Sequence, residues 1–365
     1  MKIISLCLSE SLGGLELYAL RSAVQLSKNN DVLFISPPVA MLNERLQQNE
    51  ITTRHLKPSF RPLPILTARE LARTIDEFDA DVIHMHWGKD LPLVSLAIKL
   101  SRKKPAMVYT RQMQITRMKT DFYHRFLYKE MSLMLAITNQ LRDRCARMLG
   151  EVAGERVETL YYGVPEPEQP FSANEIISQR KTQGFDEDDF IVGLFGRLED
   201  KKGKHLLIKA IARAKQKNKE LKAIIVGHEM VAGDVEELKK LASELNVSEN
   251  IVFMDFVEKP QQIMQICDCV LLATYMETFG LVLPEAMRCG IAVIGSNAGG
   301  VPEIIDHDET GLLFEPKNVD DLEKQISTLF ENKEKRQHLA HAGKQKADTV
   351  FNNEQHFKQL QSLLE

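Results

Sequence analysis

The sequence predicts an α/β protein of two domains, each built around a parallel β-sheet. Its 365 residues are too many for one typical hydrophobic core, so two domains are expected. Short apolar segments alternate with amphipathic ones in both halves, which is typical of βαβ units. The segment 162–170 holds three prolines and interrupts this alternation, so we interpret it as the linker between the domains.

The first half is expected to form a complete parallel sheet. Its predicted strands are the apolar runs Ile3–Leu8, Asp31–Ser36, Thr52–Leu56, Val82–His86, Ala106–Thr110, Leu133–Ile137 and Glu158–Tyr161. A Gly13-Gly14 turn and a helix through about Ser27 follow the first strand. Further helices are expected near Met41–Gln48, at Leu91–Ser101 and at Asn139–Leu149.

The second half repeats the pattern. Its predicted strands are Ile191–Phe195, Lys222–Val226, Ile251–Met254, Cys269–Ala273 and Ala292–Gly295. Its predicted helices are His205–Lys217, Val235–Glu244, Pro260–Gln265, Pro284–Cys289 and Asp320–Glu331, followed by a helical Gln337–Leu364 that is broken at 351–353. Two such domains are expected to enclose a cleft, with ligands at the carboxyl ends of the strands.

Composition narrows the class of protein. The chain starts without a signal-peptide core, and its apolar runs fall far short of the roughly 20 residues of a membrane span, so we expect a cytoplasmic protein with reduced cysteines. Residues 1–165 carry 23 basic against 17 acidic residues, and the remainder carries 24 against 34. This asymmetry indicates a first domain that meets anionic material, or an uneven solvated surface. Nucleic acid is a poor candidate because the net charge is −4 and no binding module is recognisable.

The strongest functional pattern is the run Glu277-Thr278-Phe279-Gly280-Leu281-Val282-Leu283-Pro284-Glu285, which follows a buried strand. Pro284 is tolerable only in the first turn of a helix, so we expect a helix that starts near Gly280. Its first N–H groups would form an anion site, flanked by the carboxylates of Glu277 and Glu285. That arrangement suits a ligand with a charged middle and hydroxylated ends, such as a sugar nucleotide. The alternative is that both glutamates are ordinary solvated helix-terminal charges.

Two glycine turns support this interpretation. Gly196-Arg197 and Lys202-Gly203 also follow a buried strand, and a guanidinium with an ammonium group suits a diphosphate, although a lysine-rich turn alone is usually a solvated surface. Gly299-Gly300-Val301-Pro302-Glu303 leads into another helix, where an ordinary strand-to-helix turn is a strong competitor. Neither turn is a Walker motif, and the lack of Gly-x-Gly-x-x-Gly argues against a dinucleotide-dependent dehydrogenase.

Together these motifs resemble glycosyltransferase family 4. The likeness rests on Glu277-x7-Glu285 and the two glycine turns, and it extends to Thr310–Phe314 and Gly13–Glu16, so it spans nearly the whole chain. It implies the GT-B fold: two Rossmann-like parallel-sheet domains facing across a cleft, with a C-terminal helix that crosses back to the N-terminal domain. The expected domains are 1–165 with about 348–365, which would bind the acceptor, and 166–347, which would bind the nucleotide sugar.

The resemblance also implies roles for individual residues. Glu277 would bind the hydroxyls of the donor sugar, and Glu285 would bind the ribose. Arg197 and Lys202 would hold the diphosphate, with the backbone of Thr278, Phe279, Gly280 and Leu281 helping and Gly14 letting the first loop approach the phosphates. We therefore expect a retaining, metal-independent hexosyltransferase without a cofactor, in which Glu277, Arg197 and Lys202 are catalytic because charge develops on the leaving diphosphate.

One departure concerns the N-terminal domain. The family often has a histidine in a segment like V-x-T-x-H, and here Val108-Tyr109-Thr110-Arg111-Gln112 places Gln112 at that position. Glutamine cannot act as an acid or a base. Three interpretations follow: the leaving phosphate acts as the base, another group takes this role, or the alignment of this segment with the family is displaced. His84 and His86 lie on one face of a predicted strand end and are candidate acceptor contacts, with packed or surface histidines as the alternative.

The segment 110–129 interleaves cations with aromatic residues and methionines. Arg111, Gln112, Arg117 and Lys119 are candidate acceptor residues within it. The pattern suits a glycan or anionic glycolipid acceptor and a transient contact with the inner face of the plasma membrane, as in bacterial lipopolysaccharide or cell-envelope synthesis. The alternative is a core-packing helix with a basic outer face. A second interpretation of the function is a non-catalytic protein that binds carbohydrate or nucleotide sugar, or a GT-B epimerase or phosphorylase. The sequence leaves the nucleotide of the donor open among UDP, GDP and ADP.

Overall fold

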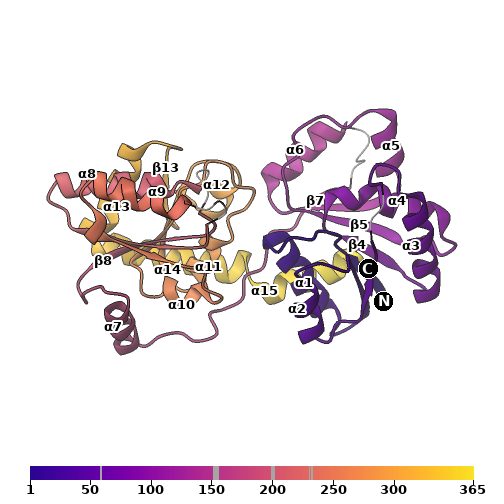
Figure 1. Ribbon diagram of the computed structural model, residues 1–365, viewed down its shortest axis with the longest axis horizontal. Helices are drawn as coiled ribbons and strands as arrows, with labels where there is room; N and C mark the ends of the chain where they lie inside the picture. Colours follow the sequence, from indigo (N-terminus) through magenta and orange to yellow (C-terminus); the bar gives the residue numbers. More distant parts are fainter. Residues whose placement is uncertain (58–59, 151–155, 199–201, 230, 232) are drawn as a thin grey trace. The chain divides into compact units, whose positions relative to one another are not determined.

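The computed structural model describes residues 1–365 except 58–59, 151–155, 199–201, 230 and 232. The chain divides into two compact units (Figure 1). The first unit comprises Met1–Tyr161 and Gln355–Glu365, and the second comprises Tyr162–Glu354. Each unit is built around one parallel sheet, as the alternation of apolar and amphipathic segments predicts.

The sheet of the first unit has the order β3-β2-β1-β4-β5-β6-β7 over the described residues. All of its neighbouring strands are parallel, and their bounds are β1 Lys2–Leu6, β2 Asp31–Ser36, β3 Thr53–His55, β4 Val82–Met85, β5 Ala106–Arg111, β6 Met131–Ala136 and β7 Val157–Thr159. The order of the strands reverses between β1 and β4. Such a switch point leaves a crevice outside the carboxyl ends of the two strands, where ligands bind in sheets of this kind.

Amphipathic helices cover this sheet because their apolar stripes pack onto it. They are α1 Gly14–Leu26, α2 Asn43–Gln48, α3 Ile65–Phe78, α4 Leu91–Leu100, α5 Phe122–Tyr128, α6 Asn139–Leu149 and the final helix α15 Asn353–Leu364. Phe357 and Leu360 of α15 belong to the same apolar core as Ile3 and Phe34 of the sheet. The prediction that the C-terminal helix returns to the N-terminal domain is therefore confirmed.

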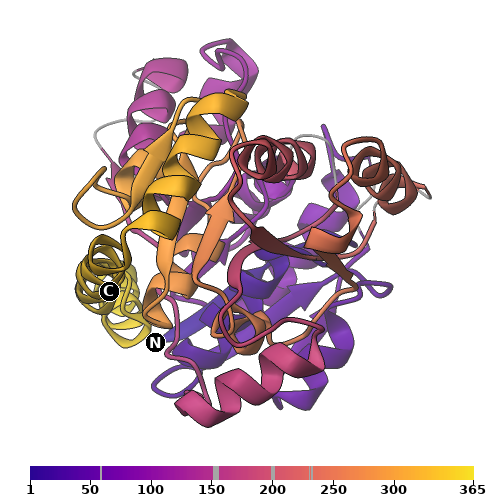
Figure 2. The same ribbon diagram turned by 90° about the vertical axis from the view of Figure 1, so that its left-hand side faces the viewer.

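The second unit is also built around a sheet that helices cover (Figure 2). Over the described residues this sheet has the order β10-β9-β8-β11-β12-β13. Its strands are β8 Phe190–Phe195, β9 Leu221–Val226, β10 Ile251–Met254, β11 Cys269–Leu272, β12 Ala292–Ser296 and β13 Leu312–Phe314. Its helices are α7 Ala173–Thr182, α8 Lys204–Gln216, α9 Asp234–Glu244, α10 Pro260–Met264, α11 Val282–Arg288, α12 Val301–Ile304, α13 Val319–Glu331 and α14 Lys333–Val350. Both units thus have the predicted fold class.

One boundary that matters for the site differs from the prediction. The helix expected near Gly280 begins at Val282, because Gly280 adopts a left-handed conformation with φ of +97°. A Cβ at Gly280 would lie 2.6 Å from the Leu272 side chain, so the glycine lets the loop pass close to β11 before the helix starts. Pro284 still lies in the first turn of α11, as the sequence requires.

Candidate functional site

Three loops of the second unit leave neighbouring strands at the same edge of the sheet. The loops follow β8, β11 and β12, which lie side by side in the order β8-β11-β12. Because the strands are parallel, their carboxyl ends share one edge. The loops hold the three sequence motifs: 196–203, 273–281 and 297–300, of which 199–201 lie outside the described residues.

Glycines bring the backbones of these loops into close contact. Gly203 has φ of +71°, and a Cβ there would lie 2.4 Å from the carbonyl oxygen of Ala273. Gly299 has φ of +62°, and a Cβ there would lie 1.9 Å from the carbonyl oxygen of Glu277. The next N–H, that of Gly300, donates to the same Glu277 oxygen at 3.1 Å. The glycines that the sequence singles out therefore position the loop that carries Glu277.

An ion pair joins the first two loops. The Nζ of Lys202 lies 2.8 Å from Oε2 of Glu277, and both side chains are partly buried. The other carboxylate oxygen of Glu277 accepts a hydrogen bond from the N–H of Thr278 at 3.3 Å. A cation and a carboxylate predicted from separate motifs are thus adjacent, with polar groups of both signs at the edge of the sheet.

Arg197 is exposed, and its backbone carbonyl oxygen accepts a hydrogen bond from a buried lysine. The Nζ of Lys204, a residue that is 2% exposed, donates to the carbonyl oxygen of Arg197 at 2.5 Å. Lys204 is a part of the site that the sequence analysis missed. Its position in a lysine-rich turn gives no sign that this ammonium group is buried rather than solvated, so sequence alone offers no signal for it.

Phe279 packs the end of the loop 273–281 against two other aromatic residues of the second unit. Its buried ring contacts Tyr162 and Phe351 edge to face, with ring centroids 5.1 Å and 5.8 Å away. These two aromatic residues lie where the chain enters and leaves the second unit, and Val164 donates to the carbonyl oxygen of Phe351 at 2.8 Å. Beyond Phe279, Leu281 is half-buried, and Glu285 lies half-buried in α11 with its N–H donating to Leu281.

In the first unit, His84 and His86 share one face of the sheet, with ring centroids 4.2 Å apart. Both are fully buried. Nε2 of His84 lies 2.7 Å from the hydroxyl of Thr110, and Nε2 of His86 lies 3.3 Å from that of Ser5. Burial lowers the pKa of His84 to about 3 and holds that of His86 well below its usual range. These histidines are neutral groups inside the core of this unit.

The other predicted residues of the first unit lie around the carboxyl end of β5 and in the loop after it. Arg111 and Gln112 are buried, and a guanidinium nitrogen of Arg111 donates to the carbonyl oxygen of Gln114 at 3.3 Å. Arg117 is exposed and Lys119 is half-buried. Burial, together with the positive charges of Arg111 and Arg117, lowers the pKa of Lys119. Gly14 opens α1 at an exposed position where a Cβ would meet no atom within 4 Å.

A further cluster, which the sequence analysis did not identify, lies beyond the ends of β1 and β4. The buried carboxylate of Asp90 accepts a hydrogen bond from the N–H of Leu8 at 2.9 Å and lies 3.4 Å from the guanidinium of Arg61. That guanidinium also lies over the ring of Trp87, 4.5 Å from its centroid. Arg61 lies in the loop before α3 and Asp90 lies in a short 3-10 helix, Gly88–Asp90, and neither belongs to a recognisable motif. Only the folded chain reveals the pair.

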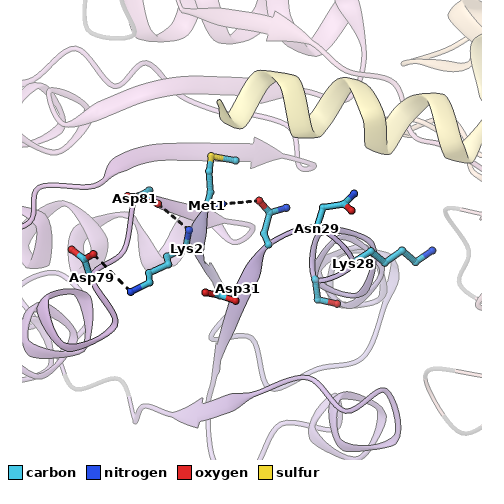
Figure 3. Close-up of a pocket in the computed structure, with 9 residues that line it drawn as sticks. Met1, Lys2, Lys28, Asn29, Asp31, Asp79 and Asp81 are labelled. Carbon is cyan, nitrogen blue, oxygen red and sulfur yellow. Dashed lines mark hydrogen bonds and ion pairs between the residues drawn. The ribbon is translucent and has the colours of Figure 1, made fainter.

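A pocket of about 680 Å³ occupies a different place in the first unit (Figure 3). Lys2 lines it together with Asp79 and Asp81: its Nζ lies 3.8 Å from Asp79, and its N–H donates to Asp81 at 2.9 Å. The pocket is at the amino ends of β1 and β2, the edge opposite to the one where ligands of parallel sheets bind. It therefore does not coincide with any of the predicted site residues.

Two kinds of feature are absent from the described residues, a cluster of metal ligands and a membrane-spanning helix. No three His, Cys, Asp or Glu side chains gather there in a way that could hold a metal ion. No helix in the described part of the chain has the length and apolar character needed to cross a membrane.

Two family models match the chain. Residues 12–166 match the model described as glycosyltransferase family 4, and residues 175–346 match that of the glycosyl transferases group 1. An uncharacterized glycosyltransferase of Methanocaldococcus jannaschii is 31% identical over 173 residues, which cover 46% of this chain but only 43% of the relative. The N-acetyl-alpha-D-glucosaminyl L-malate synthase of Bacillus anthracis is 21% identical over 310 residues, 83% of this chain and 79% of the relative.

Solved structures resemble the whole chain. HepE of Anabaena in complex with UDP has a TM-score of 0.88 and 25% sequence identity, with coverage of 100% of this chain and 99% of that one. A glycosyltransferase from Rickettsia africae has a TM-score of 0.89 at 17% identity, with coverage of 100% and 97%. The latter likeness concerns the fold alone.

Proposed function

This chain belongs to the glycosyltransferases of GT-B type, and on that premise we propose that it transfers a hexose from a nucleotide diphosphate donor to a glycan or glycolipid acceptor. The observation that carries the proposal is the ion pair between Lys202 and Glu277, which joins two motifs at the carboxyl edge of the second sheet. The 25% identical Anabaena protein is solved with UDP and with UDP-glucose, which supports a uridine nucleotide as the donor.

The donor would lie along the three loops of the second unit. The exposed guanidinium of Arg197 and the ammonium of Lys202 would take the diphosphate, and the start of α11 would add backbone N–H groups. Glu277 would turn from Lys202 towards the hydroxyls of the sugar, while Glu285 would accept from the hydroxyls of the ribose. In this proposal the ion pair between Lys202 and Glu277 keeps both groups in position while the donor is absent.

The reaction requires that negative charge be stabilised as it grows. The bond between the anomeric carbon and the diphosphate oxygen breaks, and the electron pair stays on the diphosphate. Arg197 and Lys202 would stabilise that charge, more strongly in the transition state than in the bound donor. The acceptor oxygen forms the new bond on the same face of the sugar, and its proton passes to the leaving diphosphate. This route retains the anomeric configuration and needs neither a metal ion nor a side-chain base.

The acceptor would bind to the first unit. Arg111, Gln112, Arg117 and Lys119 stand at or after the carboxyl end of β5, where ligands of parallel sheets bind. Gln112 can orient a hydroxyl group by hydrogen bonding but cannot remove its proton. His84 and His86 would support this edge from within the core, through Thr110 and Ser5. A cationic edge suits an acceptor that carries phosphate or carboxylate, as in bacterial lipopolysaccharide and other envelope glycans.

The proposal is tested by turnover with and without EDTA. Purified protein is incubated with UDP-glucose and other nucleotide sugars and with phosphorylated or lipid-linked glycan acceptors, and products are identified by mass spectrometry and by the NMR coupling at the anomeric proton. We expect an α-linked glycoside from an α-linked donor, with the same rate in EDTA. Binding of a nucleotide sugar without any transfer would favour the non-catalytic interpretation, and a changed sugar without an acceptor would favour an epimerase.

A further inference from the structure

The cluster beyond the carboxyl ends of β1 and β4 contains the one tryptophan of the chain, Trp87. Two cations stand beside its partly buried ring. The guanidinium carbon of Arg61 lies 4.5 Å from the ring centroid, and Nζ of Lys89 lies 5.0 Å from it. We call these three residues the Trp87 cluster. It lies where the strand order reverses, which is the place where parallel sheets bind ligands, and none of the donor motifs contributes a residue to it.

Arg61 is fixed in place by a buried acid. Its Nη1 lies 3.4 Å from Oδ1 of Asp90, and its Nη2 donates to the carbonyl oxygen of Leu8 at 3.4 Å. The side chain of Asp90 is fully buried, and its Oδ2 accepts from the N–H of Leu8 at 2.9 Å. These contacts orient the guanidinium while 33% of the Arg61 side chain stays exposed. Because a guanidinium has five N–H donors, Arg61 keeps donors for a ligand.

Lys89 is an exposed cation that forms no ion pair with the described residues of the chain. Its ammonium group still lies beside the same ring as Arg61, because Lys89 belongs to the short 3-10 helix Gly88–Asp90 that directly follows Trp87. Two like charges close together disfavour each other, and an anion between them removes this cost. Burial raises the pKa of Asp90 to about 7, so at neutral pH this acid offsets only a part of the positive charge.

The chemistry of the three side chains matches a phosphorylated sugar. A guanidinium binds phosphate through two parallel hydrogen bonds, and an ammonium group adds a compact charge. A phosphate monoester carries about −1.5 to −2 charges at pH 7, which two cations can balance. Tryptophan adds a rigid apolar surface and one N–H donor, which suit the C–H groups and the hydroxyls of a sugar ring. Trp87 packs against the apolar core of the unit, so its ring is held in position.

We propose that the Trp87 cluster binds a sugar phosphate, with the phosphate between Arg61 and Lys89 and the sugar ring against Trp87. The inference rests on the proposed transferase function and deepens it, because it assigns a phosphorylated sugar as the part of the acceptor that this unit recognises. Asp90 is a positioning residue that acts through Arg61. The competing interpretation is a purely structural ion pair between Arg61 and Asp90. That interpretation predicts that Lys89 can be replaced without any effect on ligand binding.

The test is the fluorescence of Trp87 in the full-length protein, without a donor. Because the chain has one tryptophan, selective excitation of indole reports on this cluster alone. Glucose 6-phosphate, glucose 1-phosphate, mannose 6-phosphate, inorganic phosphate and glucose are titrated at constant ionic strength. We expect a saturable change in emission with at least one sugar phosphate and none with glucose. Inorganic phosphate should bind about tenfold more weakly than that sugar phosphate, since it lacks the contact with the ring.

The variant Lys89→Ala should weaken the binding of the sugar phosphate about tenfold, since one charge-assisted hydrogen bond is lost and an exposed side chain is not needed for folding. Lys28→Ala is the matched control, because it removes an exposed lysine of the same unit at the amino edge of the sheet. It should bind like the wild type. Lys202→Ala removes a cation of the donor motif and should also leave this binding unchanged.

Three outcomes would overturn the proposal. They are an emission of Trp87 that no sugar phosphate changes, a Lys89→Ala variant that binds as tightly as the wild type, and a loss of binding in Lys202→Ala, which would place the sugar phosphate at the donor motif. The affinity of Lys89→Ala for UDP, measured by calorimetry, should equal that of the wild type. Donor binding is thus measured separately, so a failure of this proposal is distinguishable from a failure of the proposed transferase function.

Discussion

Lys202 and Glu277 lie 75 positions apart in the sequence, and their side chains form an ion pair of 2.8 Å. The pair is possible because β8 and β11 are neighbours and end at the same edge of the sheet. It links the motif that is predicted to bind the sugar and ribose hydroxyls of the ligand to the motif that is predicted to hold its diphosphate. In the proposed mechanism, donor binding and turnover both depend on these two side chains.

Replacement of Lys202 should therefore impair catalysis as well as binding. We expect Lys202→Ala to lower kcat by about 10²–10³-fold, since one preorganised group that stabilises developing charge has an effect of this size. Steady-state kinetics with the donor varied provide the measurement, and Lys209→Ala, which removes an exposed lysine of α8, is the control. A weaker donor affinity with unchanged kcat would contradict the proposed role of Lys202.

Gly299→Ala should disrupt the site through the backbone of Glu277. The new Cβ would have to lie 1.9 Å from the Glu277 carbonyl oxygen, so the loop must move. A displacement near 1 Å lowers turnover by about a hundredfold. Gly184→Ala is the matched control, because Gly184 also has a positive φ, of +85°, but open space at the Cβ position. Equal turnover of the two variants would show that close approach at Gly299 does not position Glu277.

Gln112→Ala should affect the acceptor and leave the donor site unchanged. Gln112 cannot transfer a proton, so its loss removes hydrogen bonds only, and kcat/KM for the acceptor should fall about tenfold. The affinity for UDP, measured by calorimetry, should equal that of the wild type. A fall in kcat of a thousandfold or more would instead assign Gln112 a direct part in the chemistry.

Stability should decline in mild acid because of the buried histidines. Burial lowers the pKa of His84 to about 3 and that of His356 to about 4, both from 6.5. Below pH 6.5 the unfolded chain binds protons that the folded chain excludes, so this stability is complete above pH 6.5 and is lost as the pH falls towards 4. Asp90 has the opposite effect on stability. Burial raises its pKa from 3.8 to about 7, so between these pH values the folded chain binds a proton that the unfolded chain has lost, and this contribution to stability increases as the pH falls. More buried histidines than buried aspartates contribute in this range, so we expect Tm to decrease when the pH is lowered from about 7 to about 5.

The variant His84→Gln isolates this effect. Glutamine does not titrate and can still form a hydrogen bond with Thr110, so Tm of the variant should fall less between the same pH values. Thermal melts of both proteins across the range provide the measurement. Parallel curves for the variant and the wild type would mean that His84 is not a source of the acid sensitivity.

Sequence reasoning predicts most of the fold, because alternating apolar segments mark parallel strands directly. The start of α11 shows its limit: Gly280 has a positive φ and passes close to Leu272 at the end of β11, and the helix starts only at Val282. Motifs located the residues of the three loops, since glycine and charge at strand ends have a recognisable spacing. The burial of Lys204, and the ring contacts of Phe279 with Tyr162 and Phe351, depend on tertiary packing that leaves no local pattern.

The most direct test of the account is a thermal-shift measurement of the purified protein with UDP, GDP and ADP and with their sugar conjugates. A ligand that binds only the folded state stabilises it by about 2.7 kcal/mol at a hundredfold excess over Kd. We predict that UDP and a UDP-sugar raise Tm, and that Lys202→Ala and Glu285→Ala each diminish the shift. If no nucleotide raises Tm, or if both variants keep the full shift, the loops after β8 and β11 are not the donor site.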